Sequence, residues 1–400
     1  MAKKAGLQQH SGRGHALLSA SGSHRWINCT PSAVLERDYG ERTTSVYANE
    51  GTLAHELAEL YLGYDVLGTS GEKEFNEGLE KVMSNELFSD EMLAAVPVYT
   101  DYCAGQFNAA KAENRVAVMF TEQKLDLGAY VPGGFGTADC VVISDGTLEV
   151  IDLKYGKGVP VEAEWNSQLM IYGLGALDKY AMAYDITDVR LTIVQPRLDS
   201  ISSWSISVTD LENWAKDTLR PKAEMAAAGE GELCAGDWCR FCSVRNTCRA
   251  LYDQQMEIAK HDFAEPDMLT DEEIADVVQR AGSFTKWLSS LTEYATAKAV
   301  TEGKQWPGLK LVEGRSVSKW RDDETAGDAI LERCKDLSPD QVFTTKLNTI
   351  TAIKKLVGEK RFAAELGDLI VKPQGQPSLV PLSDKRPAVG LAQAVADFSE

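Results

Sequence analysis

Two aspartates and a lysine lie in two short apolar runs near the middle of the chain. Asp139 lies in ADCVVIS, and Asp152 and Lys154 lie in TLEVIDLK. Neighbouring carboxylates repel one another unless a cation neutralises them, and hard cations such as Mg²⁺ and Mn²⁺ prefer oxygen ligands. Such a cation activates a bound water and polarises a phosphate, while a lysine stabilises the developing charge. These residue types therefore indicate metal-dependent hydrolysis of a phosphodiester.

The segment between the two runs predicts how they align. Asp145-Gly146 is a strong signal for a two-residue hairpin, for which we expect a type I′ turn with positive φ at both residues. The resulting register places Asp139 directly opposite Asp152, with Cβ atoms roughly 4.5–5.5 Å apart. Lys154 lies two residues further on and projects from the same face of the sheet.

A surface hairpin with solvated charges and a cross-strand salt bridge is the alternative. The flanking letters CVVI and LEVIDL are apolar at successive positions, so both faces of these strands would be buried. This pattern favours central strands, but the spacing alone leaves both interpretations open.

The elements around these runs predict an α/β core, in which a central mixed β-sheet is flanked by helices. We expect strands at 115–123, 136–144, 147–155, 189–196 and 204–208, and helices at 50–64, 80–113, 164–181, 210–228 and 271–300. We divide the chain into a flexible tail (1–20), a core that includes a cysteine-rich segment (21–254) and an accessory region of mixed α+β structure (255–400).

Four ordered motifs resemble the RecB-type branch of the PD-(D/E)xK nucleases. They are Gly51-Thr-Leu-Ala-His55, Gly136-Thr-Ala-Asp139, Asp152-Leu-Lys154 and Gln168-Leu-Met-Ile-Tyr172. The resemblance implies a restriction-endonuclease-like core and a Mg²⁺- or Mn²⁺-dependent deoxyribonuclease. It implies metal ligation by His55, Asp139, Asp152 and the backbone carbonyl of Leu153.

Each additional motif residue also has an interpretation that involves no catalysis. His55 is either a metal ligand or an ordinary helix-surface histidine. Glu59, one turn later, either holds a metal-bound water or the histidine, or is a solvated charge. Gln168 and Tyr172 share a helix face; the family implies that they contact DNA or position the lysine, and the alternative is that this face only packs on the sheet.

Cysteines at Cys234, Cys239, Cys242 and Cys248 suggest a metal rather than disulfides. In Cas4-like and AddB-like members of the nuclease branch, three such cysteines and one distant N-terminal cysteine bind a [4Fe–4S] cluster, a resemblance that implies Cys29, Cys239, Cys242 and Cys248. The alternative is Zn²⁺ at the four cysteines from Cys234 to Cys248.

A basic and aromatic segment in the C-terminal region is a weaker candidate for nucleic-acid binding. Basic residues bind phosphate and aromatic residues stack on bases, although a small β-unit with a salt-bridged surface is an equal alternative. The candidate residues are Lys310, Arg315, Lys319, Trp320 and Arg321.

The net charge of −19 argues against nonspecific coating of nucleic acid, although an acidic protein can carry a local basic groove. No window approaches the ~20 apolar residues of a membrane span, and the basic N-terminus has no continuous apolar stretch. We therefore expect a protein of the bacterial cytoplasm without membrane contact.

Nearly the whole chain also resembles the DUF2800 proteins of phages and prophages, which implies a role in phage DNA recombination or replication. We expect an exonuclease or end-processing enzyme acting on DNA ends or on single-stranded/duplex junctions. Two alternatives remain: a non-catalytic DNA-end-binding scaffold, and a subunit active only with a helicase or single-strand-annealing partner.

Overall fold

The computed structural model describes residues 16–40, 46–262, 271–314, 318–343, 349–371 and 375–381. Contacts within the chain define two compact units, residues 1–259 and 260–400. The division falls within helix α9 (Arg249–Asp262).

A five-stranded mixed sheet forms the centre of the first unit, in the spatial order β1-β2-β3-β4-β5. Its strands are β1 (Val118–Asp126), β2 (Phe135–Ser144), β3 (Gly146–Leu153), β4 (Ile186–Gln195) and β5 (Ser200–Ser207). Only β3 and β4 pair in parallel; the other neighbouring pairs are antiparallel. The expected α/β class with a central mixed sheet is thus confirmed.

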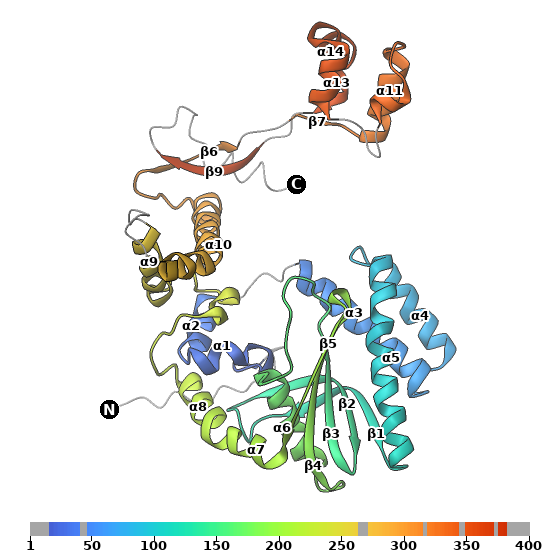
Figure 1. Ribbon diagram of the computed structural model, residues 1–400, viewed down its shortest axis with the longest axis vertical. Helices are drawn as coiled ribbons and strands as arrows, with labels where there is room; N and C mark the ends of the chain where they lie inside the picture. The colour runs from blue at the N-terminus through green and yellow to red at the C-terminus, as the bar shows by residue number, and fades with distance from the viewer. Residues whose placement is uncertain are drawn as a thin grey trace. The chain divides into compact units, whose positions relative to one another are not determined.

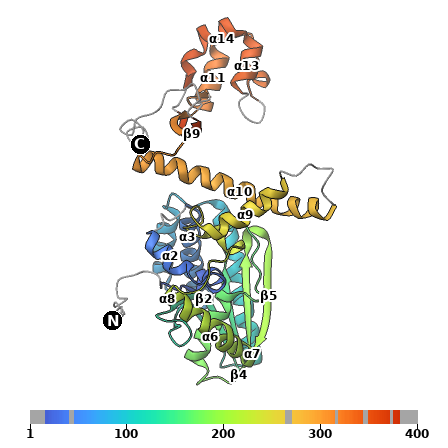
Figure 2. The same cartoon turned by 90° about the vertical axis from the view of Figure 1, so that its left-hand side faces the viewer.

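Helices cover both faces of this sheet, as Figures 1 and 2 show. One face carries α3 (Val46–Tyr61), α4 (Glu72–Met83) and α5 (Asp90–Glu113). The other carries α6 (Ser167–Tyr180), α7 (Val208–Trp214) and α8 (Arg220–Ala228), joined by α1 (Ser23–Asn28) and α2 (Ser32–Tyr39). The segment 80–113, expected to be helical, belongs to α4 and α5, which are separated by residues 84–89.

The β2–β3 hairpin has the register that the sequence predicts, since Ser144 pairs with Thr147 and Cys140 with Ile151. The prediction of a type I′ turn is wrong, because such a turn needs a positive φ at both central residues. Gly146 has a φ of 89°, but the φ of Asp145 is not positive. From Leu148 onward every residue of β3 is buried, so the alternative of an exposed surface hairpin is also wrong.

Helix α6 connects the parallel strands β3 and β4 and lies close against the sheet. Asn166 caps its first turn by accepting a hydrogen bond from the amide of Leu169 at 3.2 Å. A Cβ atom at Gly173 would approach Val189 to 3.0 Å, and one at Gly175 would approach Leu127 to 2.6 Å. The two glycines therefore permit the short distance between helix and sheet.

The N-terminal segment corrects one expectation. Leu18 and Ala20 are buried in the core on the α6 side, and Ser19 accepts a hydrogen bond from the indole of Trp26. The predicted flexible tail of residues 1–20 therefore does not include these positions, while residues 1–15 lie outside the described part of the chain.

The second unit contains helices and two small sheets. Its helices are α10 (Asp271–Glu302), α11 (Asp323–Arg333), α12 (Pro339–Val342), α13 (Ile350–Val357) and α14 (Glu359–Glu365). Strand β6 (Leu309–Gly314) pairs with β9 (Gly375–Pro381), and β7 (Lys319–Trp320) pairs with β8 (Ile370–Val371).

The predicted nucleic-acid-binding residues of this unit are divided between these sheets. Lys310 lies on β6, Lys319 on β7, and Arg321 is exposed just after β7. Trp320 is buried in an apolar core and packs near Phe362, so its proposed role in base stacking is wrong. Arg315 lies outside the described residues.

Candidate metal-dependent active site

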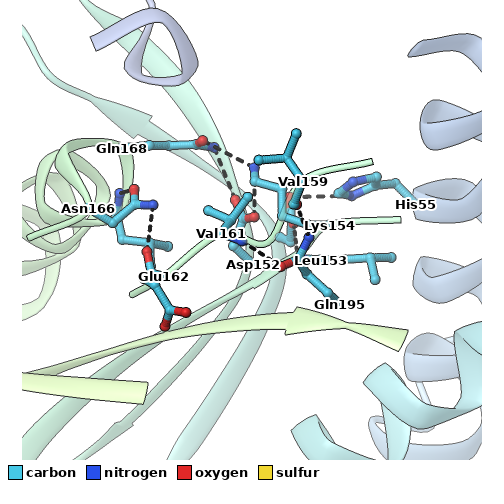
Figure 3. Close-up of polar contacts among 12 residues, drawn as sticks. His55, Asp152, Leu153, Lys154, Val159, Val161, Glu162, Asn166, Gln168 and Gln195 are labelled. Atoms are coloured by element: carbon cyan, nitrogen blue, oxygen red, sulfur yellow. Dashed lines mark hydrogen bonds and ion pairs between the residues drawn. The ribbon is translucent and has the colours of Figure 1, made fainter. Parts of the chain in front are cut away.

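The candidate site lies where β2 and β3 cease to pair, between α3 on one face of the sheet and α6 on the other. Pairing between the two strands ends at Cys140 and Ile151, one residue before Asp139 and Asp152 would face each other. Figure 3 shows His55 approaching this point from one side and Gln168 from the other.

Three side chains form a closed polar triangle at the end of β3. The ammonium of Lys154 lies 2.7 Å from Oδ2 of Asp152, and it also donates to Oε1 of Gln168 at 3.1 Å. The amide nitrogen of Gln168 in turn donates to Oδ1 of Asp152 at 3.0 Å (Figure 3). Gln168 of α6 thereby contacts one carboxylate oxygen and the lysine, and the lysine pairs with the other carboxylate oxygen.

Asp139 has a different set of partners. Its Oδ2 atom accepts a hydrogen bond from the backbone amide of Leu153 at 2.8 Å. This bond satisfies an amide that no longer pairs with the backbone of β2. Its Oδ1 atom lies 3.4 Å from Nδ1 of His55 on α3. The predicted ligands His55 and Asp139 are therefore brought together, whereas Asp152 is directed toward Lys154 and Gln168.

Glu122 of β1 completes the group on the histidine side, and sequence reasoning missed it. Glu122 lies between the pairs Thr121–Cys140 and Gln123–Ala138, opposite Asp139, and has the unusual φ of 46°. A positive φ in a residue other than glycine is strained backbone that persists only where the surroundings impose it.

The donor atoms of His55, Glu122 and Asp139 all lie within 4.8 Å of one another. Ligand atoms around an ion at about 2.0–2.3 Å lie at most about 4.6 Å apart, so the three residues can hold one divalent cation with small adjustments. One imidazole nitrogen and two carboxylate groups also suit Mn²⁺ chemically, because imidazole is a ligand for borderline cations and carboxylate for hard ones.

The pKa values in this group reflect its excess of acidic side chains. Burial lowers the pKa of His55, but the negative charges of Asp139, Asp152 and Glu122 outweigh burial and raise the pKa to about 9. Burial, together with Asp139, raises the pKa of Glu122 to about 7. Burial disfavours the ammonium of Lys154, but Asp152 and Asp139 raise its pKa, so it stays charged.

Two other predicted site residues take supporting positions. Tyr172 is buried one turn after Gln168, and a Cβ atom at Gly136 would lie only 2.8 Å from its ring, so the glycine of the second motif makes room for the tyrosine. Glu59 is exposed on α3; its charge contributes to the raised pKa of Glu122, but it does not belong to the donor group.

An arginine fixes the helix that carries His55. Arg197, in the 3-10 turn Pro196–Leu198 after β4, pairs with Glu50 of α3 at 3.1 Å and with Glu91 of α5 at 2.8 Å. Its guanidinium also lies over the ring of Tyr155 at 4.6 Å from the centroid. The side chain is only 7% exposed, so it ties α3 and α5 to the ends of β3 and β4.

The cysteines form a second candidate site. A cavity in the first unit is lined by five of them, namely Cys29, Cys234, Cys239, Cys242 and Cys248. Cys29 ends α1 and is buried, whereas Cys234 is exposed. Burial raises the pKa of Cys29 and Cys239, and that of Cys242 to about 11, so metal binding here must displace protons.

Polar contacts join the two chain segments around this cavity. Glu36 of α2 pairs with Arg25 at 2.6 Å and accepts a hydrogen bond from the amide of Ser243 at 2.7 Å. Thr30 donates to the carbonyl of Glu230 at 2.6 Å. These contacts bring Cys29 next to the distant cysteine segment, as the resemblance implies.

Comparison with protein families gives one match along most of the chain. The family described as "Protein of unknown function (DUF2800)" matches residues 15–387. The chain belongs to this family. The DUF2800 resemblance seen in the sequence is thereby confirmed, and membership of DUF2800 assigns no activity.

Among solved structures, the chain is similar to one titled "Crystal structure of SSO0001". The two are 17% identical, and the match covers 56% of this chain and 95% of that one, with a TM-score of 0.23. Within the described residues of this DUF2800 protein, no helix has the length and apolar character needed to cross a membrane.

Proposed function

We propose that this DUF2800 protein is a metal-dependent deoxyribonuclease with a restriction-endonuclease-like core of the RecB type. The observation that carries the proposal is the pairing of two groups: the donors His55, Glu122 and Asp139, and beside them the triangle of Asp152, Lys154 and Gln168. The first can hold a cation, and the second presents a fixed carboxylate and a charged lysine.

Each residue of the site has a separate role in the proposed hydrolysis. A bound Mg²⁺ or Mn²⁺ supplies an activated water and charge neutralisation at the phosphate. Asp139, His55 and Glu122 would hold the cation, and Asp152, two residues before Lys154, would offer a carboxylate oxygen from the neighbouring strand. Lys154 donates hydrogen bonds to the negative charge that develops on the phosphate. Gln168 holds the side chains of Lys154 and Asp152 in place relative to each other, because it forms a hydrogen bond with each of them.

We further propose that the substrate is the end of a DNA strand and that the reaction belongs to phage or prophage recombination or replication. The family resemblance supports this part of the proposal. The alternative is a subunit that is active only with a helicase or single-strand-annealing partner; the net charge of −19 motivates it, because an acidic chain attracts phosphates poorly.

Incubation of the full chain with linear and covalently closed circular DNA, with Mg²⁺ or Mn²⁺, tests the activity. We expect cleavage of linear DNA that chelation abolishes and that falls by about 10²-fold or more in Asp152→Asn and Lys154→Met. Lys216→Met, which alters an exposed lysine of the Ala215–Leu219 turn, is the matched control. Metal-independent DNA binding without cleavage would instead support a non-catalytic scaffold.

The cysteine cavity supports a separate proposal, a [4Fe–4S] cluster bound by Cys29, Cys239, Cys242 and Cys248. Cys29 lines the same cavity as the other three, and the zinc alternative does not use it. Such a cluster would crosslink segments more than 200 residues apart, where a crosslink restricts the unfolded chain strongly in the entropic model.

Two cysteine variants distinguish the metals. Anaerobic purification followed by iron, sulfide and zinc analysis should give iron with an equal amount of acid-labile sulfide. Cys29→Ser should lose the iron, and Cys234→Ser should retain it. Zinc that survives Cys29→Ser but is lost from Cys234→Ser would show the alternative site instead.

A further inference from the structure

An exposed tryptophan with a strained backbone lies next to the candidate active site. Trp165 has a φ of 52°, which bulky residues rarely adopt, and 60% of its surface is exposed. It stands three residues before Gln168, the residue that contacts both Asp152 and Lys154. Three residues span at most roughly 11 Å, so the indole belongs to the immediate surroundings of the site.

Helix capping alone does not account for this tryptophan. Trp165 directly precedes the N-cap residue Asn166, a position where an apolar side chain ordinarily packs against the fourth helical residue. That residue is Met170, which is fully buried, whereas most of the Trp165 side chain remains in solvent. The strained backbone therefore holds a large apolar surface outside the core.

The segment before Trp165 is anchored to the sheet, as Figure 3 shows in part. Gln195, which is buried, accepts a hydrogen bond from the amide of Val161 at 2.7 Å and donates to the carbonyl of Val159 at 3.0 Å. The amide of Ala163 donates to Ser202 of β5 at 3.0 Å. These contacts fix the loop, so the exposure of the indole is a property of the folded chain.

A second tryptophan supports the first. The ring of Trp204, on β5, lies 5.0 Å from that of Trp165 at an angle of 43°. Trp204 is partly buried against the core on the α6 side of the sheet. The two rings therefore form one exposed aromatic surface that is supported by the core, on the side of the sheet that carries Gln168.

We propose that Trp165, backed by Trp204, stacks on an unpaired base of the DNA strand that enters the active site. The inference rests on the proposed function and specifies its substrate as DNA with a single-stranded end. Bases inside a duplex have no free face for such stacking, whereas unpaired bases stack on aromatic side chains without regard to sequence.

Charge near the tryptophan limits the kind of contact. Glu162 and Glu164, which precede it by three residues and one residue, are exposed and repel phosphates. Contact through the face of the base avoids this repulsion. The contribution of Trp165 to DNA binding should therefore be nearly independent of salt concentration, unlike that of a lysine or arginine.

Binding without divalent cation separates this inference from catalysis. Fluorescence anisotropy in EDTA would compare a single-stranded oligonucleotide with a blunt duplex for the wild type, Trp165→Phe and Trp165→Ala. We expect Trp165→Ala to weaken single-strand binding by at least about fivefold, with the same salt dependence as the wild type and little effect on the duplex. Trp165→Phe should retain most of the affinity.

Met182→Ala is the control, because this fully exposed side chain lies just beyond the other end of α6. Unchanged single-strand affinity in Trp165→Ala, or an equal loss on duplex, would overturn the inference while wild-type cleavage in Mn²⁺ still supports the nuclease. A wild type that neither binds nor cleaves DNA would overturn both.

Discussion

Oδ2 of Asp139 accepts the amide hydrogen of Leu153 at 2.8 Å, across the gap where β2 and β3 separate. The carboxylate of Asp139 thus has a structural task at one oxygen while the other faces His55. The two tasks can be separated by mutation, because an asparagine still accepts a hydrogen bond but carries no charge.

Replacing Asp139 should therefore give two distinct results. Asp139→Asn should keep the bond from Leu153 and unfold near the wild-type temperature, yet bind Mn²⁺ poorly. Asp139→Ala should leave a buried amide unsatisfied and lower the free energy of unfolding by about 1–3 kcal/mol. Thermal unfolding and metal titration of both variants check this; equal stability of the two would contradict the structural role of Oδ2.

Glu122 should contribute to metal affinity although no motif marks it. Glu122→Gln removes one of three charged or ionisable donors, so Mn²⁺ affinity should fall by about tenfold or more. Glu56→Gln, at an exposed position of α3 next to His55, is the control and should leave affinity unchanged. Isothermal titration of the metal-free protein measures both, and equal affinities in the two variants would exclude Glu122 as a ligand.

The raised pKa values predict how pH acts on the metal-free protein. The folded pKa of Glu122 is about 7 and that of His55 about 9, each above its ordinary value of 4.5 and 6.5. Each group therefore stabilises the folded protein fully at a pH below its ordinary pKa. This stabilisation is lost as the pH rises through the pKa of the group in the folded protein. Metal-free stability should therefore decline from about pH 5 to about pH 9.

Metal binding should show the opposite trend, because only the deprotonated forms are ligands. The rise in melting temperature on adding Mn²⁺ should grow between about pH 6 and about pH 9, with release of protons. In His55→Ala combined with Glu122→Gln, the growth should disappear. Thermal shift measurements across this range test the trend, and a Mn²⁺ effect that shrinks with rising pH would contradict it.

Arg197 should influence the metal although it touches no ligand. Arg197→Gln removes the ion pairs with Glu50 and Glu91 and so loosens α3, which carries His55. We expect Mn²⁺ affinity to fall severalfold, up to about tenfold, at preserved secondary structure. Circular dichroism and metal titration together measure this; unchanged affinity in a folded variant would show that α3 keeps its place without the arginine.

The sequence predicts the part of the site that a short turn determines. Asp145-Gly146 fixes the register of β2 and β3, so Asp139, Asp152 and Lys154 could be aligned without a structure. The connection between β1 and β2, residues 127–134, is longer and sets no register by itself. For that reason Glu122, which only this register brings opposite Asp139, could not be identified.

Tertiary packing explains two of the other differences between sequence and structure, at Trp320 and Leu18. Trp320 stands among basic residues in the sequence, but local composition does not reveal that its ring is buried near Phe362. The turn at Asp145 and Gly146 keeps its length but not its expected backbone type. Leu18 is likewise buried in the core beside α6, and the local sequence around Leu18 does not indicate this burial.

Cleavage measured as a function of Mn²⁺ concentration tests the central claim most directly. End-labelled linear DNA would be incubated with metal-free wild-type protein and with Asp139→Asn. We predict wild-type cleavage that saturates over the same Mn²⁺ range as binding, and a loss of about 10²-fold or more in Asp139→Asn. Absence of cleavage at every Mn²⁺ concentration, or equal cleavage by the two proteins, would contradict the assignment of this site.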